Sequence, residues 1–319
     1  MKNLLLLFIF TIATSSFLWS QACCSGGTPL SSNLGIQALD NGQLDFQLSY
    51  DFNTQKDLIA GSQRLDDRRR ARNTHSILLR TSYAFSPKIS LTGLLSYVSQ
   101  EERITSNGSE NVAVASGVGD AVAMLQYQFL QTQKISLIGA AGVNIPLGKT
   151  NVIDPRTGIT EFHPDMQPGT GVWDGLFGAN ILVYDVFKRG LSFNTIFTYR
   201  HTTPRERFNG GQEYEFGNEL IVLTGFSDTY FLGLWVVDPS ILLRYRHTGL
   251  DKVNGIDASN TSGDWLHLMP GVDVHVTPKW SVGVTGEIPI WRNLEGTQLT
   301  TTYRFRLNLR YTIVPTVNL

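Results

Sequence analysis

The clearest pattern in the chain is a strict alternation of apolar and polar residues near its C-terminal end. From Tyr303 to Ile313 every second residue is apolar, and three of the residues between them are arginines. A period of two predicts a β-strand with one apolar face. The run is about twice as long as strands in soluble proteins, which usually have about 5–6 residues. Aromatic residues stand at both ends of the apolar face, as in the interfacial girdles of lipid-facing strands.

The same alternation recurs along the chain and predicts about twelve strands. It is weakest in the eighth and ninth strands, where Thr224, Gly225 and Asp238 interrupt it. An even number of such strands is typical of single-chain bacterial barrels. The predicted strands are residues 43–53, 74–85, 89–99, 117–129, 135–145, 172–185, 190–201, 213–226, 236–247, 266–277, 280–291 and 301–313.

The connections between these strands alternate between short and long. Short periplasmic turns and long external loops are typical of up-and-down outer-membrane barrels. In lipid every backbone polar group must be paired internally, so a spanning sheet has to close. We therefore predict an all-β fold, a closed antiparallel up-and-down transmembrane β-barrel with both termini on the periplasmic side. The predicted long loops are residues 54–73, 100–116, 146–171, 202–212, 248–265 and 292–300.

The N-terminal residues predict export. Lys2 precedes an apolar run from Leu4 to Phe10, which is short for a transmembrane helix, and Ser20-Gln21-Ala22 suits signal peptidase. We expect residues 1–22 to be a signal peptide, with an uncleaved anchor as the alternative. The remaining divisions are an N-terminal segment that either trails in the periplasm or plugs the barrel, the barrel itself and a C-terminal tail, at residues 23–42, 43–313 and 314–319.

Composition adds little to this prediction. A hydrophobic fraction of 42% and a mean hydropathy of -0.06 fit a secreted soluble protein as well as a barrel, because alternating strands average to neutral hydropathy. The net charge of -1 argues against a global basic field for nucleic acid. We expect an outer-membrane location in a Gram-negative cell. The expected partners are outer-membrane lipid, a small-molecule solute and the barrel-assembly machinery.

Alternation also assigns side chains to the barrel interior. Acidic residues lie on the first predicted strand and arginines on the last, and these two strands must pair to close the barrel. An Arg–carboxylate ladder across that seam either rigidifies a narrow lumen or selects polar solutes. Glu213 and Glu215 are also assigned to the interior. The predicted lumen-lining residues are Asp45, Asp51, Arg80, Asp120, Asp174, Arg200, Arg244, Arg246, Asp273, Glu287, Arg304, Arg306 and Arg310.

Two groups of residues could bind a metal. Adjacent Cys23 and Cys24 cannot form a disulfide framework for the fold. They could include a lipidated N-terminus, form a vicinal disulfide, capture a thiophilic metal such as copper or zinc, or have no chemical role. His267, Asp273 and His275 share one face of a predicted strand and form a weaker candidate. No other cofactor is expected.

Enzymatic activity is not expected. The chain has no Gly-x-Ser-x-Gly motif, and its His163 and Asp165, close together in a predicted long loop, form a weak catalytic candidate.

One motif resembles a known family. Gln167-Pro168-Gly169-Thr170-Gly171-Val172-Trp173-Asp174 opens a predicted strand, and its glycines allow a tight turn. This run resembles outer-membrane barrels of the phenol meta-pathway degradation family, which are loosely similar to FadL-type transporters of hydrophobic compounds. The Cys23-Cys24 start and the Val314–Leu319 end depart from the family pattern.

The resemblance implies a transporter-like, porin-like channel for passive passage of small solutes, hydrophobic or aromatic ones among them. The alternative is a closed structural or metal-binding barrel that acts through its Cys-Cys segment or its external loops.

Overall fold

The computed structural model describes residues 34–106, 108–208 and 211–314. The predicted signal peptide, Cys23, Cys24 and all but the first residue of the predicted tail lie outside the described residues. Among the residues that are described, no helix is long and apolar enough to cross a membrane.

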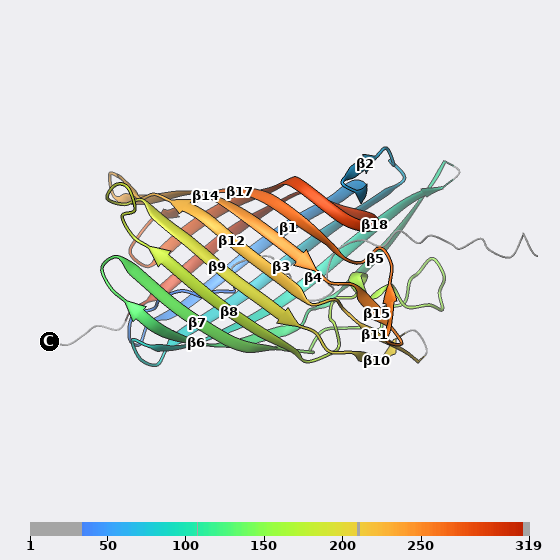
Figure 1. Cartoon of the computed structure of the whole chain (residues 1–319), viewed down its shortest axis with the longest axis horizontal. Helices are drawn as coiled ribbons and strands as arrows, with labels where there is room; N and C mark the ends of the chain where they lie inside the picture. Colours follow the sequence, from blue (N-terminus) through green and yellow to red (C-terminus); the bar gives the residue numbers. More distant parts are fainter. Residues whose placement is uncertain (1–33, 107, 209–210, 315–319) are drawn as a thin grey trace, which may run out of the picture.

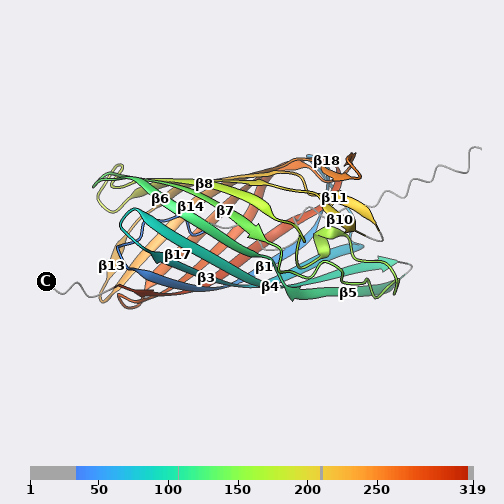
Figure 2. The ribbon, with the colours of Figure 1, turned by 90° about the horizontal axis from the view of Figure 1, so that it is seen from below.

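An antiparallel sheet that closes on itself forms the body of the molecule (Figures 1 and 2). Each strand pairs with two neighbours, and the β12–β14 pairing completes the ring. The barrel strands are β1 (Leu44–Gly61), β3 (Arg70–Ala84), β4 (Ile89–Ser106), β6 (Ala121–Gln131), β7 (Ile135–Ile145), β8 (Asp174–Val183), β9 (Ser192–His201), β12 (Glu219–Ser227), β14 (Trp235–Thr248), β17 (Gly263–His275) and β18 (Trp280–Ile313).

Strand β18 passes along the barrel twice. Residues 281–294 pair with β17, and residues 294–313 pair with β1. The chain reverses near Gly296, whose φ of +63° lies in the left-handed region that favours glycine. Within the described residues the eleven labelled barrel strands therefore make twelve passes, eleven plus one for the second half of β18. This confirms the predicted closed antiparallel barrel of about twelve strands.

The two ends of the barrel differ in their connections, and we call them the short-turn end and the long-loop end. The short-turn end, at the left of Figures 1 and 2, has tight turns and β13 (Tyr230–Leu232), which is labelled in Figure 2. The long-loop end has a second, four-stranded sheet of β10, β11, β15 and β16. Its extra elements are β2 (Gln63–Leu65), β5 (Ser109–Val118), η1 (Pro164–Met166), β10 (Arg205–Phe208), β11 (Gln212–Glu215), β15 (Asp251–Val253) and β16 (Ile256–Ala258).

Three of the predicted long loops are wrong, because their residues continue the strands. Residues 54–73 and 100–116 mostly extend β1, β3, β4 and β5, and residues 292–300 lie within β18. Backbone pairing does not require an apolar face, so a ladder can continue past the lipid region on polar residues that look like a loop in the sequence.

The predicted strand 213–226 is interrupted. Residues 216–218 separate β11 from β12. The interior assignment of Glu213 and Glu215 is therefore wrong: both lie on the four-stranded sheet at the long-loop end, and Glu213 is exposed.

Side chains alternate across the barrel wall as the pattern predicts. Leu48 and Ile77 point outward and are 48% and 51% exposed, whereas their neighbours Ser49 and Ser76 are buried. Exposed apolar side chains on the outer face are what contact with acyl chains requires.

Candidate lumen site

Acidic and basic residues meet inside the barrel along the seam between β1 and the second half of β18. Arg306 Nη2 lies 2.5 Å from Asp51 Oδ2, and Arg304 Nε lies 3.3 Å from Asp51 Oδ1. Arg310 forms an ion pair with Asp45 further along the seam. Both aspartates are almost fully buried. The structure thus places Arg–carboxylate pairs across the strands that close the barrel.

Glu287 is a second centre of charge contacts. This buried carboxylate pairs with Arg244, and its oxygens also lie 3.6 Å from Arg304 Nη1 and 3.6 Å from His267 Nε2. The contacts join β14, β17 and both halves of β18. Because Arg304 also contacts Asp51, the two centres form one network.

This network has more arginines than carboxylates. Arg80 joins it from β3, where its Nη2 donates a 2.6 Å hydrogen bond to Gln47 Oε1, and Gln47 pairs in register with both Arg80 and Arg310. The members are Arg80, Arg244, Arg304, Arg306 and Arg310 against Asp45, Asp51 and Glu287, an excess of two positive charges (5 − 3). Asp273 interacts electrostatically with Arg310 and offsets part of this excess, whereas residues 3–39 contain no charged side chain.

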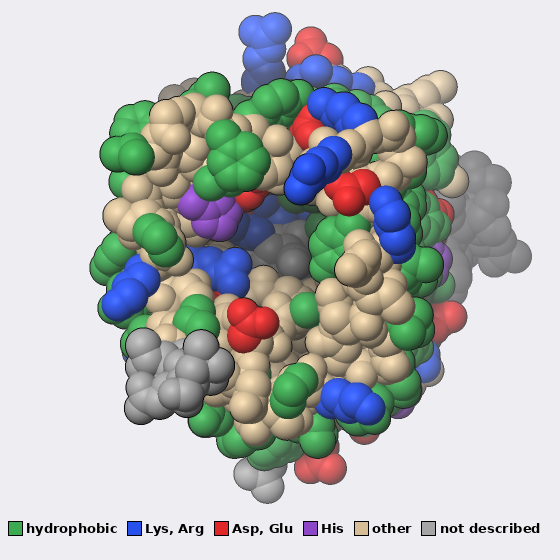
Figure 3. All heavy atoms as spheres, turned by 90° about the vertical axis from the view of Figure 1, so that its left-hand side faces the viewer, with side chains coloured by type: hydrophobic (Ala, Val, Ile, Leu, Met, Phe, Trp, Pro, Cys, Tyr) green, Lys and Arg blue, Asp and Glu red, His purple; other side chains and the backbone are tan. Residues whose placement is uncertain are grey.

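Other predicted lumen residues lie outside this network. Arg246 pairs with Glu219 at 2.5 Å, and its guanidinium lies 4.8 Å from the centre of the Trp265 ring. Asp273 is exposed; its carboxylate occupies the space where a Cβ on Gly283 would lie. Figure 3 looks into the short-turn end, where the barrel is hollowed and charged side chains line the opening.

Apolar side chains form the opposite side of the lumen, and we call them the apolar wall. They alternate with outward residues on seven neighbouring strands and continue onto β17. Arg80 pairs in register with Leu94, and Arg244 with Leu223, so the arginine network and the apolar wall meet directly at two places. The wall consists of Leu78, Leu94, Val122, Met124, Ile138, Leu176, Ile196, Leu223 and Met269.

Residues 34–39 lie between these two sides of the lumen. Leu34 and Ile36 are buried among the apolar wall. Gln126 Nε2 donates to Gly35 O at 2.9 Å, and Asn180 Nδ2 donates to Ile36 O at 2.6 Å. A Cβ on Gly178 would collide with the Ile36 side chain, so this glycine makes room for it. The described part of the N-terminal segment is thus held inside the barrel.

Gln37 connects the same segment to the seam. Its Nε2 donates to Asp45 Oδ2 at 3.0 Å, and its backbone N–H donates to Gln126 Oε1 at 3.2 Å. The segment therefore contacts both the apolar wall and the charged network.

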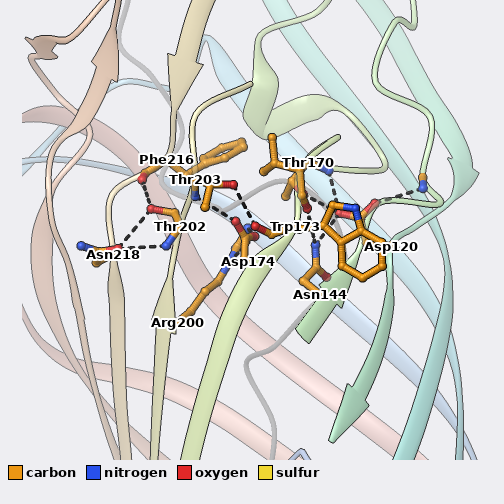
Figure 4. A network of polar contacts seen from close by, with 12 residues as sticks. Asp120, Asn144, Thr170, Trp173, Asp174, Arg200, Thr202, Thr203, Phe216 and Asn218 are labelled. Carbon is orange, nitrogen blue, oxygen red and sulfur yellow. Dashed lines mark hydrogen bonds and ion pairs between the residues drawn. The ribbon is translucent and has the colours of Figure 1, made fainter. Parts of the chain in front are cut away.

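Asp120 fastens the loop of residues 146–173 to the barrel mouth (Figure 4). It lies between β5 and β6 and is fully buried. Its carboxylate accepts bonds from Thr170 N (2.8 Å), Thr170 Oγ1 (2.6 Å), Gly148 N (3.0 Å) and Asn144 Nδ2 (3.0 Å). Gly148 and Gly169 approach so closely that a Cβ on either would meet the other's backbone. Asp120, one of the predicted lumen-lining residues, therefore holds a loop.

Asp174, at the start of β8, fixes the end of the same loop to β9. It accepts bonds from Arg200 Nε and Nη2 at 2.9 and 2.6 Å, and from Thr203 N at 3.2 Å (Figure 4). Thr203 Oγ1 donates to Trp173 O at 2.8 Å. Gly171 adopts φ +80° and Trp173 points outward, 57% exposed. The motif that begins at Gln167 thus anchors the loop at the rim.

The contacts that hold residues 163–165 of this loop were not predicted from the sequence. Arg72 of β3 pairs with Asp165 at 2.8 Å, and His163 Nδ1 lies 2.8 Å from the other oxygen of that carboxylate. Burial alone would raise the pKa of Asp165, but Arg72 and His163 outweigh it and lower the pKa to about 2. Nothing in the spacing of Arg72 and Asp165 reveals this contact, because the loop brings them together across 93 residues.

Replacing Asp120 by alanine should release the loop without unfolding the barrel. The change leaves four donors without their acceptor, and each hydrogen bond to a charged group is worth about 1.5–3 kcal/mol. We expect amide hydrogen exchange in residues 146–173 to become about a hundredfold faster, since local opening governs exchange. Exchange mass spectrometry would measure this, with exposed Asp257→Ala as the control. Unchanged protection in Asp120→Ala would contradict the anchoring role.

The histidine candidate for a metal site is not assembled. His267 contacts Glu287, whereas His275 Nε2 lies 3.0 Å from Asp238 Oδ2. Across the described ranges, no group of three or more metal-ligating side chains comes together. The metal prediction for Cys23 and Cys24 lies outside these ranges and stays a prediction.

The fold and the lumen define a class: the chain is an outer-membrane β-barrel, with an apolar outer face and a polar and apolar interior. No protein-family model matches the chain, and no curated protein sequence matches it significantly. Membership of the phenol meta-pathway family therefore stays a prediction.

Solved structures share the fold. An outer-membrane channel from Pseudomonas putida F1 superposes with a TM-score of 0.69 at 11% identity, covering 88% of this chain and 99% of that one. The β domain of the Bordetella autotransporter BrkA gives 0.48 at 10% identity, covering 86% and 100%. A Pseudomonas aeruginosa FadL homologue gives 0.41 at 9% identity, covering 92% and 98%. At such identities the likeness concerns the fold alone.

Proposed function

We propose that the chain is a channel for passive passage of small solutes across the outer membrane, hydrophobic or aromatic ones among them. The observation that supports this most is the divided lumen. An apolar wall of nine side chains faces a charged network, and residues 34–39 lie between them. A solute with an apolar body could replace Leu34 and Ile36 against the apolar wall.

The fold favours a channel over a purely structural role. The chain has the same fold over 88% of its length as a solved outer-membrane channel. The segment that lies in the lumen is attached by hydrogen bonds to the side chains of Gln126, Asn180 and Asp45 and by apolar contacts. These interactions are weaker than the covalent and sheet contacts of the barrel, so the segment can leave while the wall stays intact.

Planar-bilayer conductance of the purified protein tests the proposal. We expect small, well-defined current steps, because water and ions can pass the charged network when the segment moves. Parallel assays of liposomes loaded with a small aromatic solute should show faster efflux than protein-free liposomes. A well-folded barrel that neither conducts nor speeds efflux would overturn the proposal.

A closed barrel is the second candidate function. Buried ion pairs and residues 34–39 lie within the described lumen, which favours a structural role or one exercised by the Cys23-Cys24 segment. Titration of copper or zinc into the mature protein and into its Cys23→Ser/Cys24→Ser variant separates these ideas. Equal affinity of the two forms would exclude metal capture by the cysteines.

Contact with the barrel-assembly machinery remains a prediction.

A further inference from the structure

On the outer face of β1, β3, β4 and β18, the side chains change from apolar to aromatic and then to polar toward the long-loop end. Leu48 and Leu79 lie at mid-height, and Tyr50, Phe52 and Phe305 form an aromatic cluster above them. Above the cluster, Thr54 Oγ1 donates to Asn73 Oδ1 at 2.8 Å. This order from apolar to aromatic to polar marks the edge of the lipid region.

Immediately above this edge lies a cleft of about 760 Å³ whose walls are mostly basic. Register pairs place part of its lining on the outer face, because Arg103 pairs with Ala71, two positions above Asn73 on the same face. The basic residues come from β1, β2, β3, β4 and the connection between β2 and β3, around β2 at the end shown at the right of Figure 1. They are Lys56, Arg64, Arg68, Arg70 and Arg103.

Carboxylates compensate these charges only in part. The cleft itself contains Asp66 and Asp67, two against five. Asp67 is already engaged by Arg69 at 3.0 Å and by Arg70 at 3.8 Å, and its side chain is 6% exposed. Arg68 lies 3.6 Å from Asp66, but both side chains are about nine-tenths exposed.

The two remaining arginines have partners outside the cleft. Arg64 contacts Asp57 at 2.9 Å, and Asp57 is shared with Arg292; the Arg64 side chain remains 69% exposed. Arg103 contacts Glu101 and Glu110 and is 47% exposed. Exposed ion pairs of this kind contribute little, so their arginines are available to a stronger anion.

We propose that this cleft binds the phosphate groups of a phosphorylated lipid in the outer leaflet. The loop-length rule places the long-loop end outside the cell, where lipid phosphates lie just above the aromatic edge. Guanidinium groups bind phosphate through paired hydrogen bonds, and several of them around one cleft match a headgroup with more than one phosphate. The aromatic and leucine side chains below the cleft contact the acyl chains of the same lipid.

The test uses the full mature chain in a neutral detergent, titrated with diphosphorylated lipid A and followed by native mass spectrometry. Each basic side chain at a membrane surface contributes about a fivefold gain in affinity. We therefore expect the Lys56→Gln/Arg64→Gln/Arg68→Gln variant to bind lipid A about a hundredfold more weakly. The matched control, Lys134→Gln/Arg189→Gln/Lys279→Gln, removes the same charge from the short-turn end and should bind like the wild type.

Two results would overturn the proposal. One is equal lipid A binding by the cleft variant and the wild type. The other is competition by inorganic pyrophosphate at the same concentration as lipid A, which would make the cleft a site for soluble anions. All three replaced side chains are exposed, so the variant should retain the heat-dependent gel shift of a folded barrel. The single variant Arg68→Glu, at a side chain 93% exposed, provides a second measurement.

Discussion

Replacing both Leu34 and Ile36 by serine is expected to open the lumen. Burial of a leucine or isoleucine side chain contributes roughly 1.5–3 kcal/mol, so the two changes weaken the docked segment by about 3–6 kcal/mol. A change of that size shifts the ratio of open to occluded barrels by at least about a hundredfold. The barrel strands keep all their pairings, so the variant should fold normally.

Single-channel recording measures this effect as a longer time spent in the highest conductance level. The control is Ile159→Ser/Ile256→Ser, which removes two apolar side chains that are 85% and 74% exposed in the long loops. The occluding role of residues 34–39 would be refuted if both double variants conducted like the wild type.

The second large effect is expected on stability, from Glu287→Gln. This change removes the one carboxylate that contacts Arg244, Arg304 and His267 together. Removing one partner of a buried ion pair generally costs about 3–5 kcal/mol, because the remaining charge is left buried without compensation. The excess positive charge of the network also rises from two to three, so the lumen should become more selective for anions.

Urea unfolding in lipid vesicles, followed by tryptophan fluorescence, would give the free-energy difference. Glu206→Gln provides the control, since this glutamate is exposed on β10. A decrease in the free energy of unfolding below about 1 kcal/mol, typical of surface ion pairs, would mean that water in the lumen screens Glu287. The charged network would then not stabilise the barrel.

Alternation along the strands was enough to predict the barrel and the side of the wall to which most residues point. The seam is the best example. Because strand one is acidic and the last strand contains Arg304, Arg306 and Arg310, closure of the sheet alone brings them together. The period-two alternation and the requirement that the sheet close were sufficient for this prediction.

Contacts that depend on loop geometry could not be predicted in this way. The loop of residues 146–173 folds over the mouth, and its partners Asp120 and Arg72 are far from it in the sequence. The apolar wall was also missed. An inward leucine such as Leu94 or Leu176 breaks the polar-inside pattern and looks like noise until the burial of Ile36 explains it. The strand extensions were hidden because many of their residues are charged or polar, as in Glu101-Glu102-Arg103, and look like a loop in the sequence.

The ion pairs between β1 and β18 also affect the register in which the barrel closes. These are the first and last strands in the sequence, so they meet after the largest loop closure in the chain. A slip of one residue would turn Arg306 and Arg310 toward acyl chains, and a slip of two would move them away from Asp51 and Asp45. Only the observed register of β1 against β18 pairs Arg304, Arg306 and Arg310 with Asp51 and Asp45. These ion pairs therefore disfavour other registers of the first and last strands while the barrel closes.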